Sequence, residues 1–149
     1  MDAADPDFAT RVRDSFDRQA AMRTLGASIE SVEAGRVAIA MGHRDELTQQ
    51  HGFLHAGMLA AALDSACGYA AFSLMPADAA VLTIEFKINL LAPARGPRFR
   101  LEGQVVKPGR TISVVDGRAL QLGDDGREQL VATMTATVMT VLGREGVRQ

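Results

Sequence analysis

The chain has 149 residues with 47% hydrophobic and 23% charged side chains, a formal net charge of -2 and an isoelectric point of about 5.9. These values are ordinary for one globular domain spanning 1–149, and the mildly acidic balance argues against a nucleic-acid partner, which selects a basic surface. No run of about 18 uncharged apolar residues is present, so no membrane span is expected. The single cysteine, Cys67, cannot form an internal disulfide, and without a signal-peptide core the protein is predicted to be cytoplasmic.

Residues 1–25 predict an N-terminal helical segment. Phe8, Val12 and Phe16 recur at four-residue spacing, which is the stripe of an amphipathic helix. Ala20 continues this stripe, and Arg and Asp residues occupy the other faces. We therefore expect one helix here, with its apolar side against the rest of the domain.

The stretch 27–44 predicts two strands. Val37, Ile39 and Met41 alternate with alanines, as expected for a strand with one face in the core. The next residues, 44–57, are polar and irregular and predict a loop of about a dozen residues. Loops of that length in a compact domain are usually functional.

The run 57–75 predicts a buried helix of about five turns, because it is rich in Ala, Leu and Met and ends before a proline. Asp64 is its only acidic residue. A carboxylate in a buried helix is costly, so Asp64 has two interpretations. It lies on one solvated stripe of the helix, as most Asp residues do, or the protein needs a carboxylate in its interior.

Four strand-like segments follow the helix: 80–93, 97–109, 110–123 and 127–143. They are rich in β-branched residues and separated by turns of Gly, Pro and Asp. No crossover helix interrupts them, so an antiparallel meander is expected. The predicted fold class is α+β, with a long central helix wrapped by a curved antiparallel sheet of about six strands.

The element order and the motif His55-Ala56-Gly57, with Asp64 about two turns further on, resemble the hotdog-fold acyl-CoA thioesterases of the phenylacetate-degradation (PaaI-like) group. The signature of that group is a loop ending in His-Gly-Gly that opens the central helix, followed by an Asp. The resemblance covers roughly 26–143. One departure is Ala56, where the family usually has the first Gly; Ala keeps the backbone N–H but adds a Cβ beside the substrate.

The resemblance implies that Asp64 acts as general base or nucleophile on a thioester. It also implies that the backbone N–H groups of Ala56 and Gly57, at the positive end of the helix, polarise the thioester carbonyl. Gln49 stands six residues before His55, where related enzymes carry an Asn that holds the carbonyl. His55 itself is expected to have a structural role more than a role in proton transfer.

Further site residues are predicted by the same resemblance. Thr83 falls where some relatives carry a Ser that helps the attacking water. Arg110, in the basic turn "KPGR", is expected to meet the phosphates of CoA. Phe53, Met58 and Leu59 are expected to line the substrate site.

No metal and no cofactor are expected. His51 and His55 form an H-x-x-x-H pair, but the pair lacks the Glu of a zinc-protease motif and a third ligand is not evident. The leading hypothesis is hydrolysis of an acyl-CoA to free acid and CoA. Two alternatives stay open, a hotdog hydratase or dehydratase that pairs His55 with Asp64, and a non-catalytic acyl-CoA-binding module.

The strand at 80–93 predicts a homo-oligomer, either a dimer or a dimer of dimers. It carries apolar residues on both faces, and open sheet edges are a liability unless they are paired. Its two faces are expected to be Val81, Thr83, Glu85 and Lys87 on one side and Leu82, Ile84, Phe86 and Ile88 on the other. By resemblance, each site would combine Gln49 and Ala56 of one chain with Asp64 of its partner.

Overall fold

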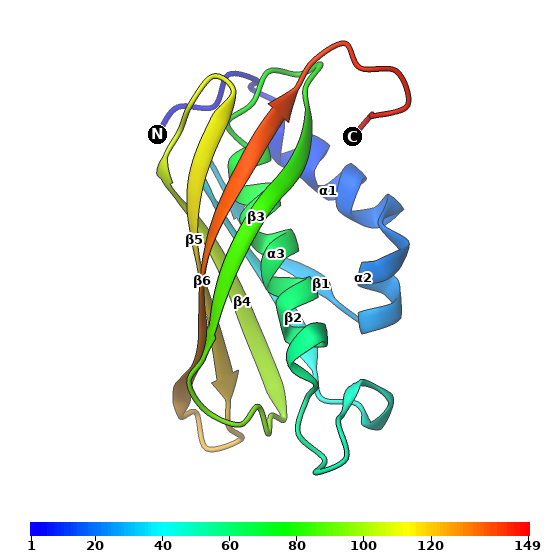
Figure 1. Ribbon diagram of the computed structural model, residues 1–149, viewed down its shortest axis with the longest axis vertical. Helices are drawn as coiled ribbons and strands as arrows, with labels where there is room; N and C mark the ends of the chain where they lie inside the picture. The colour runs from blue at the N-terminus through cyan, green and yellow to red at the C-terminus, as the bar shows by residue number, and fades with distance from the viewer.

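One long helix, α3, lies across the concave side of a curved, six-stranded antiparallel sheet in the computed structural model, which describes residues 1–149 (Figure 1). The helices are α1 (Phe8–Arg18), α2 (Ala20–Leu25) and α3 (Ala56–Phe72), with a short 3-10 turn, η1 (Asp45–Leu47), before α3. The strands are β1 (Ser28–Glu33), β2 (Arg36–Gly42), β3 (Ala80–Leu90), β4 (Arg98–Lys107), β5 (Ile112–Leu122) and β6 (Glu128–Val141). This arrangement confirms the predicted α+β class. None of the helices combines the length and the apolar character needed to cross a membrane.

The strand order β1-β2-β4-β5-β6-β3 shows that the predicted meander of the last four strands is wrong in one place. Strands β4, β5 and β6 do form a meander, but β3 pairs with the far side of β6. The connection 91–97 is responsible, because it crosses the end of the sheet instead of making a tight hairpin (Figure 1). There, the Ala94 carbonyl accepts a hydrogen bond from the Leu54 N–H at 2.9 Å. As a result, β3 is an edge strand.

A β-bulge at Ile84 changes the predicted faces of β3. Thr83 and Glu85 pair with consecutive residues of β6, so Ile84 has no partner. Thr83 reaches α3 before the bulge, and Ile88 packs on the core beyond it. Glu85 instead turns to the outer face, where its carboxylate accepts a hydrogen bond from a β6 threonine. The prediction that the odd-numbered residues share one face is therefore wrong beyond Thr83.

Two glycines let α3 lie directly on the sheet. Gly103 of β4 and Gly117 of β5 are paired neighbours beneath the helix. A Cβ at Gly103 would lie 2.3 Å from the Ala66 carbonyl oxygen, and one at Gly117 would lie 2.9 Å from Cys67 Sγ. Only glycine allows an approach this close. The close contact fixes the height of the middle of α3 above the sheet, and Asp64 lies in that part of the helix.

The N-terminal segment is two helices, not the single predicted one. Gln19 separates α1 from α2 with an extended backbone (φ -83, ψ 101). Val12 and Phe16 are buried, as the apolar stripe predicts. Ala20 is exposed, because the break at Gln19 interrupts the helix and with it the four-residue repeat. Gly26, in the left-handed region at φ 67, then ends α2. The two helices lie along the side of α3 that the sheet leaves open (Figure 1).

Candidate active site

His55 caps the beginning of α3. Its Nδ1 accepts a hydrogen bond from the Gly57 N–H at 2.8 Å, and its carbonyl accepts hydrogen bonds from Met58 and Leu59. This cap agrees with the structural role expected for His55. It also engages the Gly57 N–H, so the Ala56 N–H is left as the donor without a partner in the chain.

Gln49 is held with its amide NH₂ free. Its Oε1 accepts a hydrogen bond from the His51 N–H, which fixes which end of the amide is oxygen. Its backbone N–H donates to the Phe53 carbonyl at 2.9 Å, and its carbonyl accepts from Gly52 at 3.0 Å. The loop before α3 is thus a tight turn that presents Gln49 Nε2 as a donor without a partner in the chain.

These donors share one cavity of about 470 Å³ at the N-terminal end of α3. Gln49, His55 and Ala56 form its polar wall, and Phe53 and Leu59 belong to its apolar lining, as predicted. The crossing connection after β3 closes it from the other side. The predicted lining residue Met58 is not among the residues of this cavity; its side chain packs on the core instead.

Asp64 lies in a second, smaller cavity of about 230 Å³ between α3 and β3. Thr83 Oγ1 donates a hydrogen bond to Asp64 Oδ1 at 2.8 Å, so the structure brings together the predicted carboxylate and its predicted helper. Gln49 and Ala56 are absent from this cavity. One chain therefore carries two separate sets of the predicted residues.

Burial sets the electrostatics of Asp64. Desolvation raises the pKa of its carboxyl above the ordinary value, and the Thr83 hydrogen bond lowers it in part. No Lys, Arg or His forms an ion pair with Asp64. A carboxylate with a raised pKa is a stronger base, and such groups are concentrated at functional sites. Burial likewise raises the pKa of the Cys67 thiol, which leaves it in the inert thiol form.

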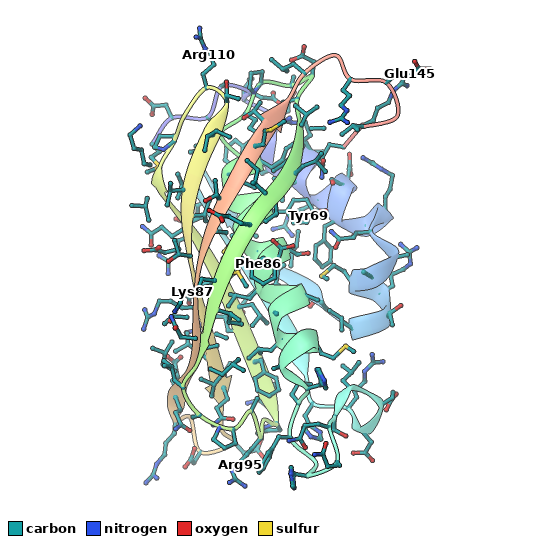
Figure 2. The ribbon with its side chains drawn as sticks, in the orientation of Figure 1. Tyr69, Phe86, Lys87, Arg95, Arg110 and Glu145 are labelled. Carbon is teal, nitrogen blue, oxygen red and sulfur yellow. The ribbon has the colours of Figure 1, made fainter.

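Arg110 lies far from the cavity that holds Gln49 and Ala56. It is exposed in the turn between β4 and β5, at the opposite end of the molecule from Arg95 (Figure 2). Arg95 is a basic residue beside this cavity, with its guanidinium carbon 4.6 Å from the centroid of the Phe53 ring. It forms no ion pair, and its backbone N–H donates to Gln121 Oε1 at 2.9 Å. Arg95 was not predicted as a site residue, because residues 92–96, "APARG", resemble a turn between two strands.

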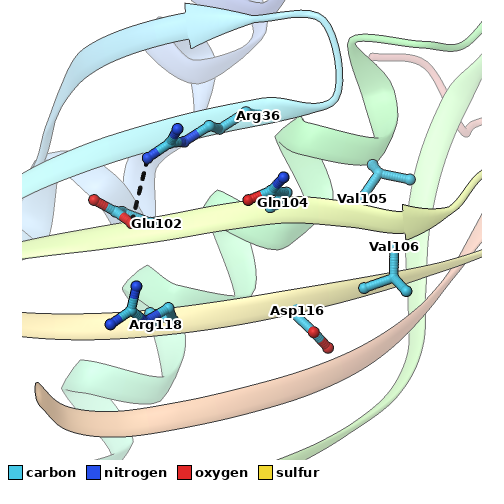
Figure 3. Close-up of a pocket in the computed structure, with 7 residues that line it drawn as sticks. All are labelled: Arg36, Glu102, Gln104, Val105, Val106, Asp116 and Arg118. Atoms are coloured by element: carbon cyan, nitrogen blue, oxygen red, sulfur yellow. Dashed lines mark ion pairs between the residues drawn. The ribbon is translucent and has the colours of Figure 1, made fainter. Parts of the chain in front are cut away.

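A third cavity, of about 310 Å³, lies on the outer face of the sheet and contains none of the predicted site residues (Figure 3). Its walls carry charges of both signs, and Arg36 pairs with Glu102 at 3.7 Å. Glu102 also pairs with Arg100 at 2.8 Å. Because these charges compensate one another, the surface offers no net positive site for phosphate groups.

His51 and His55, the H-x-x-x-H pair of the sequence, are engaged in other contacts. His55 is engaged as the helix cap, and the His51 ring lies 6.3 Å from the Phe53 ring. No group of three or more His, Cys, Asp or Glu side chains lies close enough together to hold a metal ion.

Comparison with known proteins identifies the family. A family model described as "Thioesterase superfamily" matches residues 51–126, which run from the loop before α3 to the turn after β5. A thioesterase family protein from Silicibacter pomeroyi is 57% identical, with a TM-score of 0.89 over 91% of this chain and 99% of that one. The chain therefore belongs to the Thioesterase superfamily, the class of thioester hydrolases that the sequence predicted.

Two further relatives agree with this assignment. A protein of Ralstonia eutropha JMP134, described as a "putative thioesterase, phenylacetic acid degradation-related protein", is 28% identical, with a TM-score of 0.76 over 89% of this chain and 98% of that one. A "Putative esterase" of Saccharolobus solfataricus is 35% identical over 62% of this chain, and the match spans 65% of that protein's length. The predicted hotdog fold and the likeness to the phenylacetate-degradation group are confirmed.

The raised pKa of Asp64 predicts a pH-dependent gain in stability for Asp64→Asn. Below the ordinary Asp pKa, 3.8, the carboxyl is protonated in the folded and unfolded states and costs nothing. As the pH rises through the raised folded value, the folded state has to ionise a half-buried carboxyl, so the wild type loses stability that the variant keeps. Thermal unfolding should show Asp64→Asn a few degrees above the wild type at neutral pH and level with it in acid.

The exposed Asp78→Asn is the matched control and should not change the unfolding temperature. An Asp64→Asn protein that is no more stable than the wild type at neutral pH, or a gain that is equal at every pH, would contradict this electrostatic account.

Proposed function

We propose that the protein hydrolyses an acyl-CoA thioester to a free acid and CoA, with Asp64 as the catalytic carboxylate. The observation that carries the proposal is the Thr83–Asp64 hydrogen bond, which holds a half-buried carboxylate between α3 and β3 in a cavity. No ion pair accounts for a charge at this place. Membership of the thioesterase class gives this carboxylate a reaction to perform.

The chemistry assigns a task to each group. Asp64 takes a proton from water while the water oxygen attacks the thioester carbonyl carbon; the C–S bond then breaks, and the CoA thiolate takes up a proton. Alternatively the carboxylate attacks the carbonyl carbon directly, the C–S bond breaks and releases CoA, and water hydrolyses the resulting mixed anhydride to the free acid and the Asp64 carboxylate. The Ala56 N–H and Gln49 Nε2 would donate to the carbonyl oxygen as negative charge develops on it. Since the Thr83 hydroxyl donates its hydrogen bond to Asp64 Oδ1, its lone pairs remain to accept a hydrogen bond from the water.

One chain cannot supply all of these groups to one substrate. Ala56 and Asp64 are two turns apart on the same straight helix, about 12 Å along its axis. The reacting atoms of a thioester need donor and base within about 3–3.5 Å of one carbonyl group. We therefore infer that the site is shared, with the Ala56 N–H and Gln49 of one protomer facing Asp64 and Thr83 of its partner.

The edge strand β3 offers the surface for this pairing. Most large apolar side chains that remain exposed lie on β3 or directly after it: Leu82, Ile84, Phe86, Leu90 and Leu91. An unpaired edge with such side chains is a template for another strand. A second copy pairing antiparallel along β3 would bury them and bring two α3 helices together. A homodimer, or a pair of such dimers, follows from this proposal.

Arg95 is the better candidate than Arg110 for binding the CoA phosphates. It lies against Phe53, a lining residue of the cavity that holds the proposed carbonyl donors, and it forms no ion pair with a carboxylate. The two N–H groups of Arg95 and Gly96 both donate to Gln121 Oε1, at 2.9 and 3.2 Å, which holds the loop in place. A fixed, unpaired guanidinium is well suited to a phosphate group.

The two alternatives left open by the sequence, a hydratase or dehydratase and a binding module, require different features of the site. A hydratase would use His55 as an acid or base, and because its Nδ1 accepts from the Gly57 N–H, only Nε2 is left for that role. A binding module would need the cavities but not a half-buried carboxylate. The cytoplasmic location stays a prediction.

Release of free thiol from a panel of acyl-CoA esters tests the reaction. The wild type should release thiol, and Asp64→Asn should lower kcat by about 10²–10⁴, the range for loss of a general base. Asp78→Asn is again the control and should retain full activity. Addition of water without thiol release would indicate a hydratase, binding without turnover would indicate a sensor, and near wild-type turnover by Asp64→Asn would remove that residue from the mechanism.

The phosphate assignment predicts that Arg95→Ala raises KM for an acyl-CoA about two- to fivefold at low salt, the value of an exposed ion pair, and spares kcat. The effect should vanish with the matching acyl-pantetheine, which lacks the nucleotide. Arg98→Ala is the matched control, since Arg98 already pairs with Asp124 at 3.4 Å. An increase in KM for Arg110→Ala but not for Arg95→Ala would place the phosphates at the β4–β5 turn instead.

A further inference from the structure

We infer that the cavity beside Asp64 holds the acyl group of the substrate, and that Gly68 and Gln19 set the largest acyl group it accepts. This inference rests on the proposed thioester hydrolysis. Asp64 has to lie next to the carbonyl carbon, which carries the acyl group on one side and the sulfur of CoA on the other. At about 230 Å³ the cavity is smaller than the ~300–1,000 Å³ of pockets that take a drug-sized ligand. It therefore has room for an acyl group and not for CoA.

Gly68 keeps this cavity open. It follows Asp64 by one turn of α3, so the two residues share a face of the helix, and both line the cavity. A Cβ at Gly68 would have no heavy atom within 4 Å, whereas one at Gly103 would lie 2.3 Å from a backbone oxygen. Packing within the chain thus requires glycine at Gly103 but not at Gly68. A glycine inside a helix is unfavourable, so the space above Gly68 is best explained by a ligand.

Gln19 closes the cavity from the side of the N-terminal helices. Its Nε2 donates to the Tyr69 hydroxyl and its Oε1 accepts from Ser65 Oγ, both at 3.0 Å. Ser65 and Tyr69 are one turn apart on α3, so the amide of Gln19 bridges two consecutive turns of that helix. The break between α1 and α2 lies at this same residue. Both ends of the amide are engaged, which makes it a fixed wall and not a mobile side chain.

A hydrogen-bond network supports this wall. The Tyr69 hydroxyl also lies 3.1 Å from Ser15 Oγ, and Gln149 Nε2 donates to the same Ser15 oxygen at 3.0 Å. Ser15 and Tyr69 are both buried. Gln19 and Ser15 belong to the N-terminal segment, outside the residues 51–126 that match the family model. Of the two residues that limit the acyl size, Gln19 thus lies outside that match and Gly68 lies within it.

The test is the kcat/KM profile over straight-chain acyl-CoA esters from acetyl to dodecanoyl. Gly68→Ala should retain activity toward the shortest esters and lose about 10- to 200-fold on the longest ester that the wild type accepts, since methylene discrimination has this size. Its unfolding temperature should be equal or higher, because alanine favours the helix. Gln19→Ala should gain about tenfold or more on esters beyond the wild-type optimum.

Two control variants show whether a change in the profile comes from the length of the Gln19 side chain. Gln19→Met keeps the length of the side chain without its amide and should keep the wild-type size limit. Gln104→Ala makes the same change as Gln19→Ala on the outer face of the sheet and should leave the kcat/KM profile unchanged. Profiles of Gly68→Ala and Gln19→Ala that run parallel to the wild-type profile would overturn the inference. If Gln19→Ala fails to fold, Gly68→Ala decides alone, since it removes no hydrogen bond. A wild type that releases thiol from none of the esters would instead refute the proposed function, and this inference with it.

Discussion

The hydrogen bond from Thr83 to Asp64, 2.8 Å long, connects the edge strand β3 to the central helix at the place where the helix carries its carboxylate. A half-buried carboxylate without an ion pair loses hydration, and Thr83 is the only side chain that replaces part of it. The glycines beneath α3 set the height of the helix above the sheet, and the bulge at Ile84 comes directly after Thr83. Helix height, strand register and the position of the carboxylate are therefore interdependent.

The second constraint is the length of a helical turn. The proposed donor at Ala56 and the proposed base at Asp64 are on one helix, too far apart to meet at one carbonyl group. The exposed apolar side chains of β3 lie on the edge where a second copy would bring the missing groups. In the proposed mechanism, the same constraint separates two tasks within a chain: the end of α3 would provide the carbonyl donors, and its middle would provide the carboxylate and the room for an acyl group.

Local patterns in the sequence predicted most of the elements, whereas the roles of the residues in the helix motif came from the resemblance and stay predictions. The Ala-rich run predicted the central helix, and the alternation of β-branched residues predicted six strands. His55 and Asp64 marked the helix motif that carries the resemblance. Long-range features, such as the pairing of strands, could not be predicted from the sequence. The pairing of β3 with β6 depends on a crossing connection that resembles a turn in sequence. The bulge at Ile84 inserts one residue without a partner in β6, and the break at Gln19 coincides with side-chain hydrogen bonds to α3; neither feature has a pattern in the local sequence.

The shared site is the central claim, and heterodimers test it most directly. Asp64→Asn and Gln49→Ala chains, each inactive as homodimers, would be co-expressed with different tags and purified as the mixed dimer. One of its two sites would then be intact, so the account predicts about half of the wild-type thiol release. In a second mixed dimer, one wild-type chain would be paired with a chain that carries both substitutions, and every shared site would be damaged. An inactive first heterodimer together with a half-active second one would show that each chain works alone and would contradict the account.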